Sequence, residues 1–211
     1  KVMTSEISQD AAAIRRFQRE AKFTSSLNHP NTIRVYDFGL TEAGLLYLVM
    51  ELLEGNELSA ELRRSGGCFG ATRAIHIAIQ ILRSLREAHQ LGIIHRDLKP
   101  DNVFLREIAG EGDLVKVMDF GIAKSVRGDL SQVTSAGALL GTPAYMSPEQ
   151  ARGQTLDARS DLYTMGTILF EMLAGRLPFP VRSDATPVQV LIAKIMHPAP
   201  ELSAVCPDLK G

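Results

Sequence analysis

The sequence predicts an α+β protein in which a small sheet and one helix come first and a mainly helical part follows. Three observations support this class: a helical period in residues 10–26, two short apolar runs within residues 32–50, and long helical patterns after residue 71. The two parts meet near Glu54-Gly55-Asn56, where a turn-forming pair interrupts the pattern. We therefore expect residues 1–53 to form a first lobe and residues 54–211 to form a second.

The first lobe contains one helix and two strands in this prediction. Ile14, Phe17 and Ala21 recur at spacings of three and four, which predicts a helix over residues 10–26 with Asp10 as its cap. Residues 32–38 and 45–50 are apolar, β-branched or aromatic, and residues 39–44 between them contain glycine. This pattern is typical of two adjacent strands in a small antiparallel sheet.

The second lobe is predominantly helical. Thr72 is a candidate N-cap for a long helix that ends near Leu91-Gly92. Apolar residues at helical spacing indicate the buried face of that helix: Ile75, Ile79, Leu82 and Leu85. Short strands are predicted at residues 103–105 and 115–118, on either side of a polar insert at residues 106–113, and a further helix over residues 160–174.

Composition excludes several classes of protein. The chain has 211 residues, of which 45% are hydrophobic and 22% charged, and its formal charge is -1. A dedicated nucleic-acid binder or a polybasic membrane-surface module would be strongly basic. The longest apolar run, residues 45–50, is far shorter than the ~20 residues that span a bilayer. We expect no nucleic-acid partner and no membrane contact within these residues, whereas a small anionic ligand is compatible with the composition.

Two motifs carry the chemistry. His95-Arg96-Asp97-Leu98-Lys99-Pro100-Asp101-Asn102 is followed by Asp119-Phe120-Gly121, 22 residues from Asp97 to Asp119. Gly141-Thr142 and Ser147-Pro148-Glu149 come next in the same order. Each match alone is weak, but the ordered set resembles the catalytic segment of protein kinases. Residues 145–153 and 157–161 resemble the bacterial, eukaryotic-like (Hanks-type) serine/threonine branch. The resemblance implies a bilobal kinase fold with a partial N-lobe and a mainly helical C-lobe.

Phosphoryl transfer from ATP requires positioning and charge neutralisation more than covalent chemistry by the protein. By resemblance, Asp97 accepts the proton of the attacking hydroxyl, while Asn102 and Asp119 supply oxygen ligands to Mg²⁺ on the phosphates. Lys99 places a positive charge near the transferred phosphoryl group and favours serine/threonine over tyrosine specificity. Thr142 belongs to the element that binds the protein substrate. The implied cofactors are therefore ATP and Mg²⁺.

The resemblance assigns six further residues to ATP binding: Lys1, Glu20, Met50, Glu51, Leu53 and Phe104. Lys1 corresponds to the strand lysine that pairs with a helix glutamate, here Glu20, and reaches the phosphates. Met50 is at the gatekeeper position, and the backbone of Glu51 and Leu53 faces the adenine. Phe104, two residues after Asn102, is the candidate for the apolar floor below the base.

Regulation is expected between Asp119 and Glu149, where Ser131, Thr134 and Ser135 lie in a polar stretch. Thr134 lies seven residues before Gly141, as the activating threonine does in similar bacterial kinases, and Ser135 is the second choice. A phosphate on Thr134 could pair with Arg96, beside Asp97, and with Lys124. These pairs would order the loop relative to the active site.

The departures from the family pattern point to a portion of a longer kinase domain. No glycine-rich loop precedes Lys1, and the region that supplies the arginine partner of Glu149 does not follow. We therefore expect a domain truncated at both ends, that is, a fragment of a longer parent protein. Activity of the parent protein cannot then be assumed for the fragment. The parent is expected to be cytoplasmic, or the cytoplasmic part of a membrane-anchored protein, with Ser/Thr protein substrates and a homodimer for autophosphorylation.

Two other classes were compared with this interpretation. A pseudokinase or scaffold fragment remains an alternative because the glycine-rich loop is missing, although Asp97, Asn102 and Asp119 are intact. A small-molecule phosphotransferase of the aminoglycoside-kinase type would share the catalytic aspartate. That class lacks the elements at residues 141–149 that frame a peptide substrate, so they argue against it.

Overall fold

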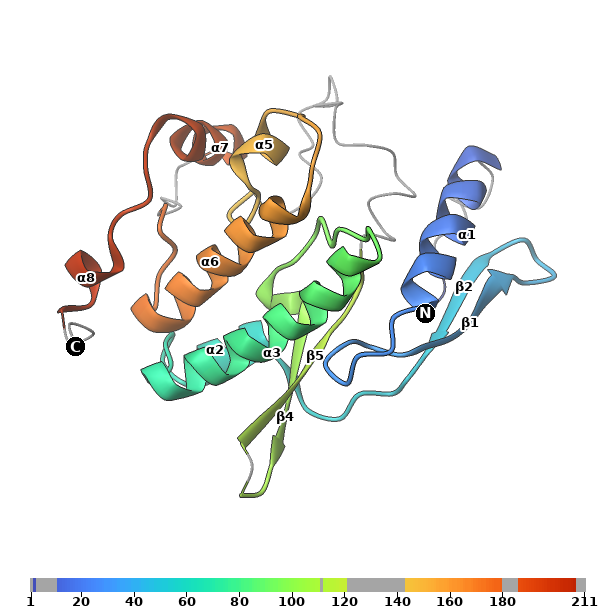
Figure 1. Ribbon diagram of the computed structural model, residues 1–211, viewed down its shortest axis with the longest axis horizontal. Helices are drawn as coiled ribbons and strands as arrows, with labels where there is room; N and C mark the ends of the chain where they lie inside the picture. The colour runs from blue at the N-terminus through green and yellow to red at the C-terminus, as the bar shows by residue number, and fades with distance from the viewer. Residues whose placement is uncertain (1, 3–10, 111, 121–142, 180–185, 208–211) are drawn as a thin grey trace.

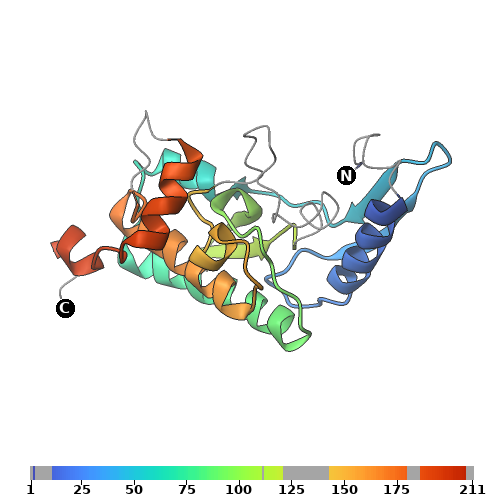
Figure 2. The same ribbon diagram turned by 90° about the horizontal axis from the view of Figure 1, so that it is seen from above.

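The computed structural model describes residues 2, 11–110, 112–120, 143–179 and 186–207, which form two lobes (Figures 1 and 2). The first lobe contains α1 (Ala11–Ser25) and the antiparallel pair β1 (Val35–Leu40) and β2 (Leu46–Met50). The second contains a sheet of three strands in the order β3 (Asn56–Glu57), β4 (Val103–Ile108) and β5 (Gly112–Val117). Its helical elements are α2 (Leu58–Arg64), α3 (Ala71–Gln90), the 3-10 turn η2 (Pro100–Asn102), α5 (Pro148–Ala151), α6 (Ala158–Ala174), α7 (Pro187–Met196) and α8 (Leu202–Val205). The predicted α+β class is confirmed.

The first lobe has its own small core between the helix and the sheet. Ala13, Phe17 and Ala21 on α1 are buried and cluster with Leu46 and Leu48 of β2. The helix therefore forms as its apolar period predicts. Its expected cap, Asp10, lies outside the described residues.

The first predicted strand begins later than the sequence suggested. It was expected to start at residue 32, but β1 starts at Val35. Ile33 instead donates its backbone N–H to the carbonyl of Val117 at 2.9 Å, and Val117 donates to the carbonyl of Asn31 at 2.8 Å. Residues 31–33 are therefore hydrogen-bonded to β5, and this segment attaches the first lobe to the second.

Helix α3 is the centre of the second lobe and packs against β5 and α6. The predicted burial of Leu85 is confirmed, whereas the rest of the predicted face is wrong, because Ile75, Ile79 and Leu82 are 50%, 44% and 38% exposed. The buried face consists of Ala74, Ile77, Ala78, Gln80, Ile81, Ser84, Leu85 and Ala88. Small residues on this face allow close packing of the neighbouring elements. Thr72 is not the cap, since α3 begins at Ala71 after an extended Gly70.

Strands β4 and β5 extend further than predicted and form a long hairpin (Figure 1). The expected polar insert at residues 106–113 is largely strand, with Arg106 paired to Leu114 and Ile108 paired to Gly112. Polar residues are compatible with strand here because side chains at the end of such a hairpin reach solvent. Just before β3, Gly55 has φ +123°, and an added Cβ would clash with the carbonyl oxygen of Leu105 on β4. Only glycine fits this position.

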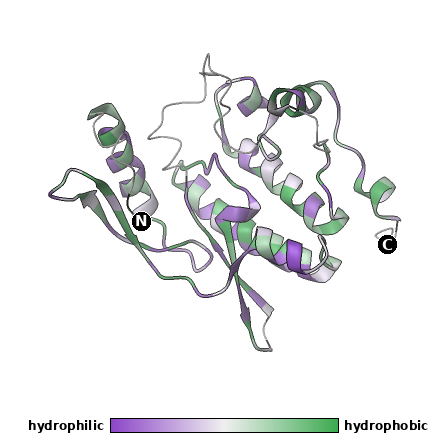
Figure 3. Ribbon diagram, turned by 180° about the vertical axis from the view of Figure 1, so that it is seen from behind, coloured by the Kyte–Doolittle hydropathy of each residue, from purple (hydrophilic) through white to green (hydrophobic). Residues whose placement is uncertain are grey.

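Helices α5, α6 and α7 lie together on the far side of α3 from the β4–β5 hairpin (Figures 1 and 3). Helix α6 begins after Asp157, which caps the backbone N–H of Arg159, and ends at Gly175 with φ +68°. Helix α7 packs against α5. Figure 3 colours most of α7 as hydrophobic. Within the described ranges, no helix combines the length and the apolar character needed to cross a membrane.

Candidate active site

His95 fixes the start of the loop formed by residues 95–102, the catalytic loop that the kinase resemblance implies. Its ring is fully buried and lies 4.6 Å from the ring of Phe120 between centroids. Nε2–H donates to the carbonyl oxygen of Met118 at 2.9 Å, so Nδ1 is the acceptor for the backbone N–H of Asp97 at 3.3 Å. Burial lowers the pKa of His95, which favours this neutral tautomer. One imidazole therefore connects Asp97 to the segment that contains Asp119.

Asn102 and Lys99 surround the Asp97 carboxylate. The side-chain amide of Asn102 donates to the carbonyl oxygen of Asp97 at 2.8 Å and to its Oδ2 at 3.4 Å. Lys99 Nζ lies 4.0 Å from the same Oδ2. The Asp97 and Lys99 side chains are 21% and 25% exposed, so both are open to an incoming molecule. Because the Asn102 amide nitrogen faces Asp97, its Oδ1 is the atom that can ligate a cation.

The residue before Asp119 is hydrogen-bonded to Asn102. The backbone N–H of Met118 donates to the carbonyl oxygen of Asn102 at 2.8 Å, which joins the two motifs. Within the described residues, the non-glycine positions with positive φ are Arg96 at +63° and Asp119 at +55°. Arg96 lies within the catalytic loop, and Asp119 follows the residue whose backbone is hydrogen-bonded to it. Such conformations cost free energy and persist where the surrounding structure holds them.

Asp161 on α6 holds the strained residue Arg96. Its carboxylate accepts backbone N–H groups from His95 at 2.8 Å and from Arg96 at 3.1 Å. The same group also accepts from Nε2 of His89 on α3 at 2.7 Å. Asp161 is only 2% exposed, so two helices and the catalytic loop meet at one buried carboxylate. The sequence motif contained Asp161, but nothing local in the sequence indicated this contact.

Residues at the start of α5 also contact the catalytic loop. Ser147 and Gln150 form a reciprocal capping box at the start of α5. The side chain of Gln150 also donates to the carbonyl oxygen of Arg96 at 2.8 Å. Gln150 was not among the predicted site residues. It links the start of α5 to the backbone of Arg96, beside Asp97.

Glu51, in the connection between the lobes, is bound at both its backbone and its side chain. Its backbone N–H donates to the carbonyl oxygen of Arg34, and its Oε1 accepts the backbone N–H of Arg34 at 2.8 Å. Lys116 on β5 donates to the same Oε1 at 2.7 Å. Phe104 pairs with Lys116 across the ladder, so the two side chains share one face of the sheet. Phe104 is thereby on the face from which Lys116 reaches Glu51 in the connection between the lobes, which we call the hinge (residues 51–53).

The remaining predicted ATP residues lie around the first lobe. Met50 ends β2 and is half-buried against the core of that lobe, and Leu53 is half-buried in the hinge. Glu20 is half-buried on α1, where its Oε1 accepts from Arg19 at 3.4 Å. Val2 forms an isolated antiparallel bridge with Tyr47 of β2. Five predicted site residues lie outside the described residues: Lys1, Lys124, Thr134, Ser135 and Thr142.

No group of three or more His, Cys, Asp or Glu side chains suited to a metal ion occurs among the residues that the structure describes. Mg²⁺ typically takes only one or two protein carboxylates and completes its shell with phosphate oxygens and water. The amide oxygen of Asn102 and the carboxylate of Asp119 are hard donors of the required kind, so the residues present fit such an ion.

Comparison with known proteins agrees with the fold described above. The family model for the protein kinase domain matches residues 1–206. The chain is 48% identical over 181 residues to the serine/threonine-protein kinase pkn3 of Myxococcus xanthus, covering 85% of this chain and 33% of that protein. It is 40% identical over 219 residues to PknB of Mycolicibacterium smegmatis, covering 97% of this chain and 34% of that protein. The chain therefore belongs to the protein kinase family, and the two curated relatives named here are bacterial serine/threonine kinases.

A solved structure gives the same result for the fold. The crystal structure of the PknI kinase domain of Mycobacterium tuberculosis superposes with a TM-score of 0.71 at 27% identity. The match covers 99% of this chain and 71% of that domain. Compared with the two curated relatives named above, the chain spans about a third of their length. Protein kinases as a family use ATP and Mg²⁺.

Proposed function

We propose that this chain is the catalytic segment of a serine/threonine protein kinase that transfers the γ-phosphate of ATP to hydroxyl groups of protein substrates. The observation that supports this best is the hydrogen-bonded arrangement of Asp97, Asn102 and the segment leading into Asp119. It supports the proposal because phosphoryl transfer requires a proton acceptor close to the metal ligands, and these are the roles proposed for Asp97, Asn102 and Asp119.

Each residue has a distinct role in the proposed reaction. The carboxylate of Asp97 orients the substrate hydroxyl and accepts its proton, and the adjacent Lys99 ammonium balances charge that develops on the phosphoryl oxygens. Asn102 and Asp119 would hold Mg²⁺, which neutralises the phosphates when it is bound. His95 and Asp161 position the loop without touching the substrate.

ATP is proposed to lie between the lobes. The backbone of Glu51 and Leu53 would bind the adenine edge, with Met50 behind it and Phe104 below it. The Glu51 contacts with Lys116 and Arg34 support this assignment because they fix the hinge backbone that would face the base. Lys1 and Glu20 are proposed to reach the phosphates as a pair.

The kinase resemblance also leads us to propose how the protein is regulated, in which compartment it acts and whether it forms a dimer. Phosphorylation at Thr134, with Ser135 as the second choice, would let Arg96 and Lys124 bind the phosphate and order the loop that carries Thr142. Because the phosphate donor is ATP, the reaction is assigned to the cytoplasm. A homodimer of the full-length protein would allow autophosphorylation in trans.

The experiment is a phosphotransfer assay on the full-length protein with γ-labelled ATP, Mg²⁺ and a mixture of Ser-, Thr- and Tyr-containing peptides. Label should appear on phosphoserine and phosphothreonine after hydrolysis of the products. Nucleotide binding without transfer to any peptide or to the protein itself would contradict the proposal and favour the pseudokinase alternative.

A further inference from the structure

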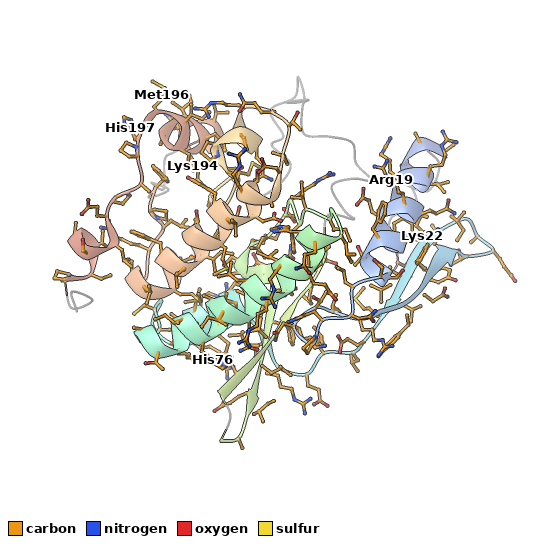
Figure 4. The ribbon with its side chains drawn as sticks, in the orientation of Figure 1. Arg19, Lys22, His76, Lys194, Met196 and His197 are labelled. Carbon is orange, nitrogen blue, oxygen red and sulfur yellow. The ribbon has the colours of Figure 1, made fainter. Side chains whose placement is uncertain are left out.

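Lys194 on α7 is a buried lysine that the proposed reaction does not use (Figure 4). It is only 4% exposed, whereas lysines are almost always at the surface unless they are paired. Among the residues that the structure describes, no carboxylate lies within ion-pair distance of its Nζ. The ring of Tyr163 on α6 lies 5.5 Å from Nζ, measured to the centroid.

The partners of Lys194 are backbone carbonyl groups of one short segment. Nζ donates to the carbonyl oxygen of Ala144 and, at 2.9 Å, to that of Met146. The carbonyl oxygen between them, on Tyr145, accepts from Thr164 Oγ1 at 2.9 Å. Three consecutive carbonyl groups are thus bound by side chains of α6 and α7.

This segment has no regular secondary structure that could satisfy these carbonyl groups. Residues 144–146 lie in a turn and an irregular stretch before α5. Met146 is buried, and a buried backbone acceptor without a partner costs free energy. Lys194 supplies two of the three bonds, so the position of the segment depends on α7.

The segment is connected directly to the catalytic loop. Ser147 follows it and forms the capping box with Gln150, and Gln150 donates to the carbonyl oxygen of Arg96, beside Asp97. On its other side the segment follows Thr142, which the family resemblance assigns to substrate binding. Residues 144–146 therefore lie in the chain between the proposed substrate-binding residue and the residue that holds the catalytic loop.

We propose that Lys194 is a positioning residue for the protein substrate: by binding the carbonyl groups of Ala144 and Met146 it fixes the segment against which the substrate peptide lies. The inference rests on the proposed function, because it requires a peptide substrate at this segment. It predicts that loss of the amine affects binding of the peptide and leaves binding of ATP nearly unchanged.

The test compares three variants of the full-length protein with the unmodified one. Lys194→Met keeps the length of the side chain and removes its N–H groups, Lys194→Gln keeps N–H groups on a shorter side chain, and Lys22→Met removes an exposed lysine of α1 as the control. We expect Lys194→Met to raise the KM for a peptide substrate by about tenfold, which corresponds to the loss of hydrogen bonds to buried acceptors. Lys194→Gln should give an intermediate KM, and the KM for ATP should change less than about twofold in all variants.

A second readout does not depend on turnover. Hydrogen exchange of backbone amides should become faster at residues 144–147 in Lys194→Met, while amides in the middle of α6 keep their rates. A parental peptide KM in Lys194→Met would overturn the inference even if exchange changed, since Lys194 would then be only structural. If the unmodified protein phosphorylated no peptide, the proposed function would fail instead, and the exchange comparison would still decide whether Lys194 holds the segment.

Discussion

The carboxylate of Asp161 accepts a 2.8 Å hydrogen bond from the backbone N–H of His95, 66 residues earlier in the chain. A second bond, from Arg96, holds that residue at a positive φ. The conformation of the catalytic loop therefore depends on a buried charge that belongs to another helix.

Replacement of Asp161 by asparagine should lower both stability and turnover. The variant loses the negative charge and turns an amide toward backbone N–H groups, which we expect to cost on the order of 2–4 kcal/mol of unfolding free energy. Urea unfolding and kcat of the full-length protein measure the two effects. Asp157→Asn is the matched control, because Asp157 is 54% exposed and asparagine caps a helix equally well. Equal stability of the two variants would contradict this role for Asp161.

Lys116→Met should weaken ATP binding with little effect on the peptide. The variant removes the ion pair that fixes the Glu51 side chain at the hinge. A partly exposed pair of this kind contributes about 1 kcal/mol, so the KM for ATP should rise by up to about fivefold. Steady-state kinetics with each substrate varied in turn measures the change. A rise in the peptide KM alone would argue against a hinge role.

The buried amine of Lys194 should make stability depend on pH above neutrality. Burial lowers the pKa of Lys194 to about 8 from 10.5, so the folded state disfavours the ammonium. The resulting cost is present in full below pH 8 and disappears as the pH rises toward 10.5, so this residue makes the protein more stable with rising pH in that window. The neutral amine still has two N–H groups for its two carbonyl partners.

The measurement is the difference in unfolding free energy between the unmodified protein and Lys194→Met at pH 7.5 and 9.5. The destabilisation caused by the substitution should grow by on the order of 1–2 kcal/mol at the higher pH. The comparison with the variant removes the effect of other groups that titrate there, including Tyr163, which faces the amine and whose own pKa is raised by burial. The same difference at both pH values would show that Lys194 does not titrate in this window.

The predicted and unpredicted parts of the site differ in how far apart their residues are in the sequence. The motif from His95 to Asn102 is local, and the sequence alone identified Asp97, Lys99 and Asn102 as neighbours. The contact of Asp161 with His95 spans 66 residues and depends on how α6 packs. No period or motif in one sequence carries that information.

The buried face of α3 was predicted wrongly because it, too, is decided by packing against distant parts of the chain. Two apolar series follow the helical period, one through Ile75, Ile79 and Leu82 and the other through Ile77 and Ile81. The second is buried because alanine and serine beside it allow other elements to pack closely. Counting large apolar residues does not register this contribution.

Phosphorylation of the loop that carries Thr134 should control turnover. Mass spectrometry of the active full-length protein should find phosphate within residues 131–135, and Thr134→Ala should lower kcat more than Ser131→Ala does. The physical reason is the phosphate pair with Arg96, which adjoins Asp97. A fully active protein without phosphate in this loop would refute the prediction.

The central claim is that Asp97 accepts the proton of the substrate hydroxyl while Asn102 and Asp119 bind the metal. The most direct measurement is single-turnover transfer from Mg²⁺·ATP to a peptide by the full-length Asp97→Asn variant, with nucleotide affinity determined by titration. We expect transfer to fall by about a hundredfold or more with nearly unchanged affinity, whereas Asp119→Asn should weaken Mg²⁺·ATP binding itself. Transfer by Asp97→Asn at the rate of the unmodified protein would contradict the account.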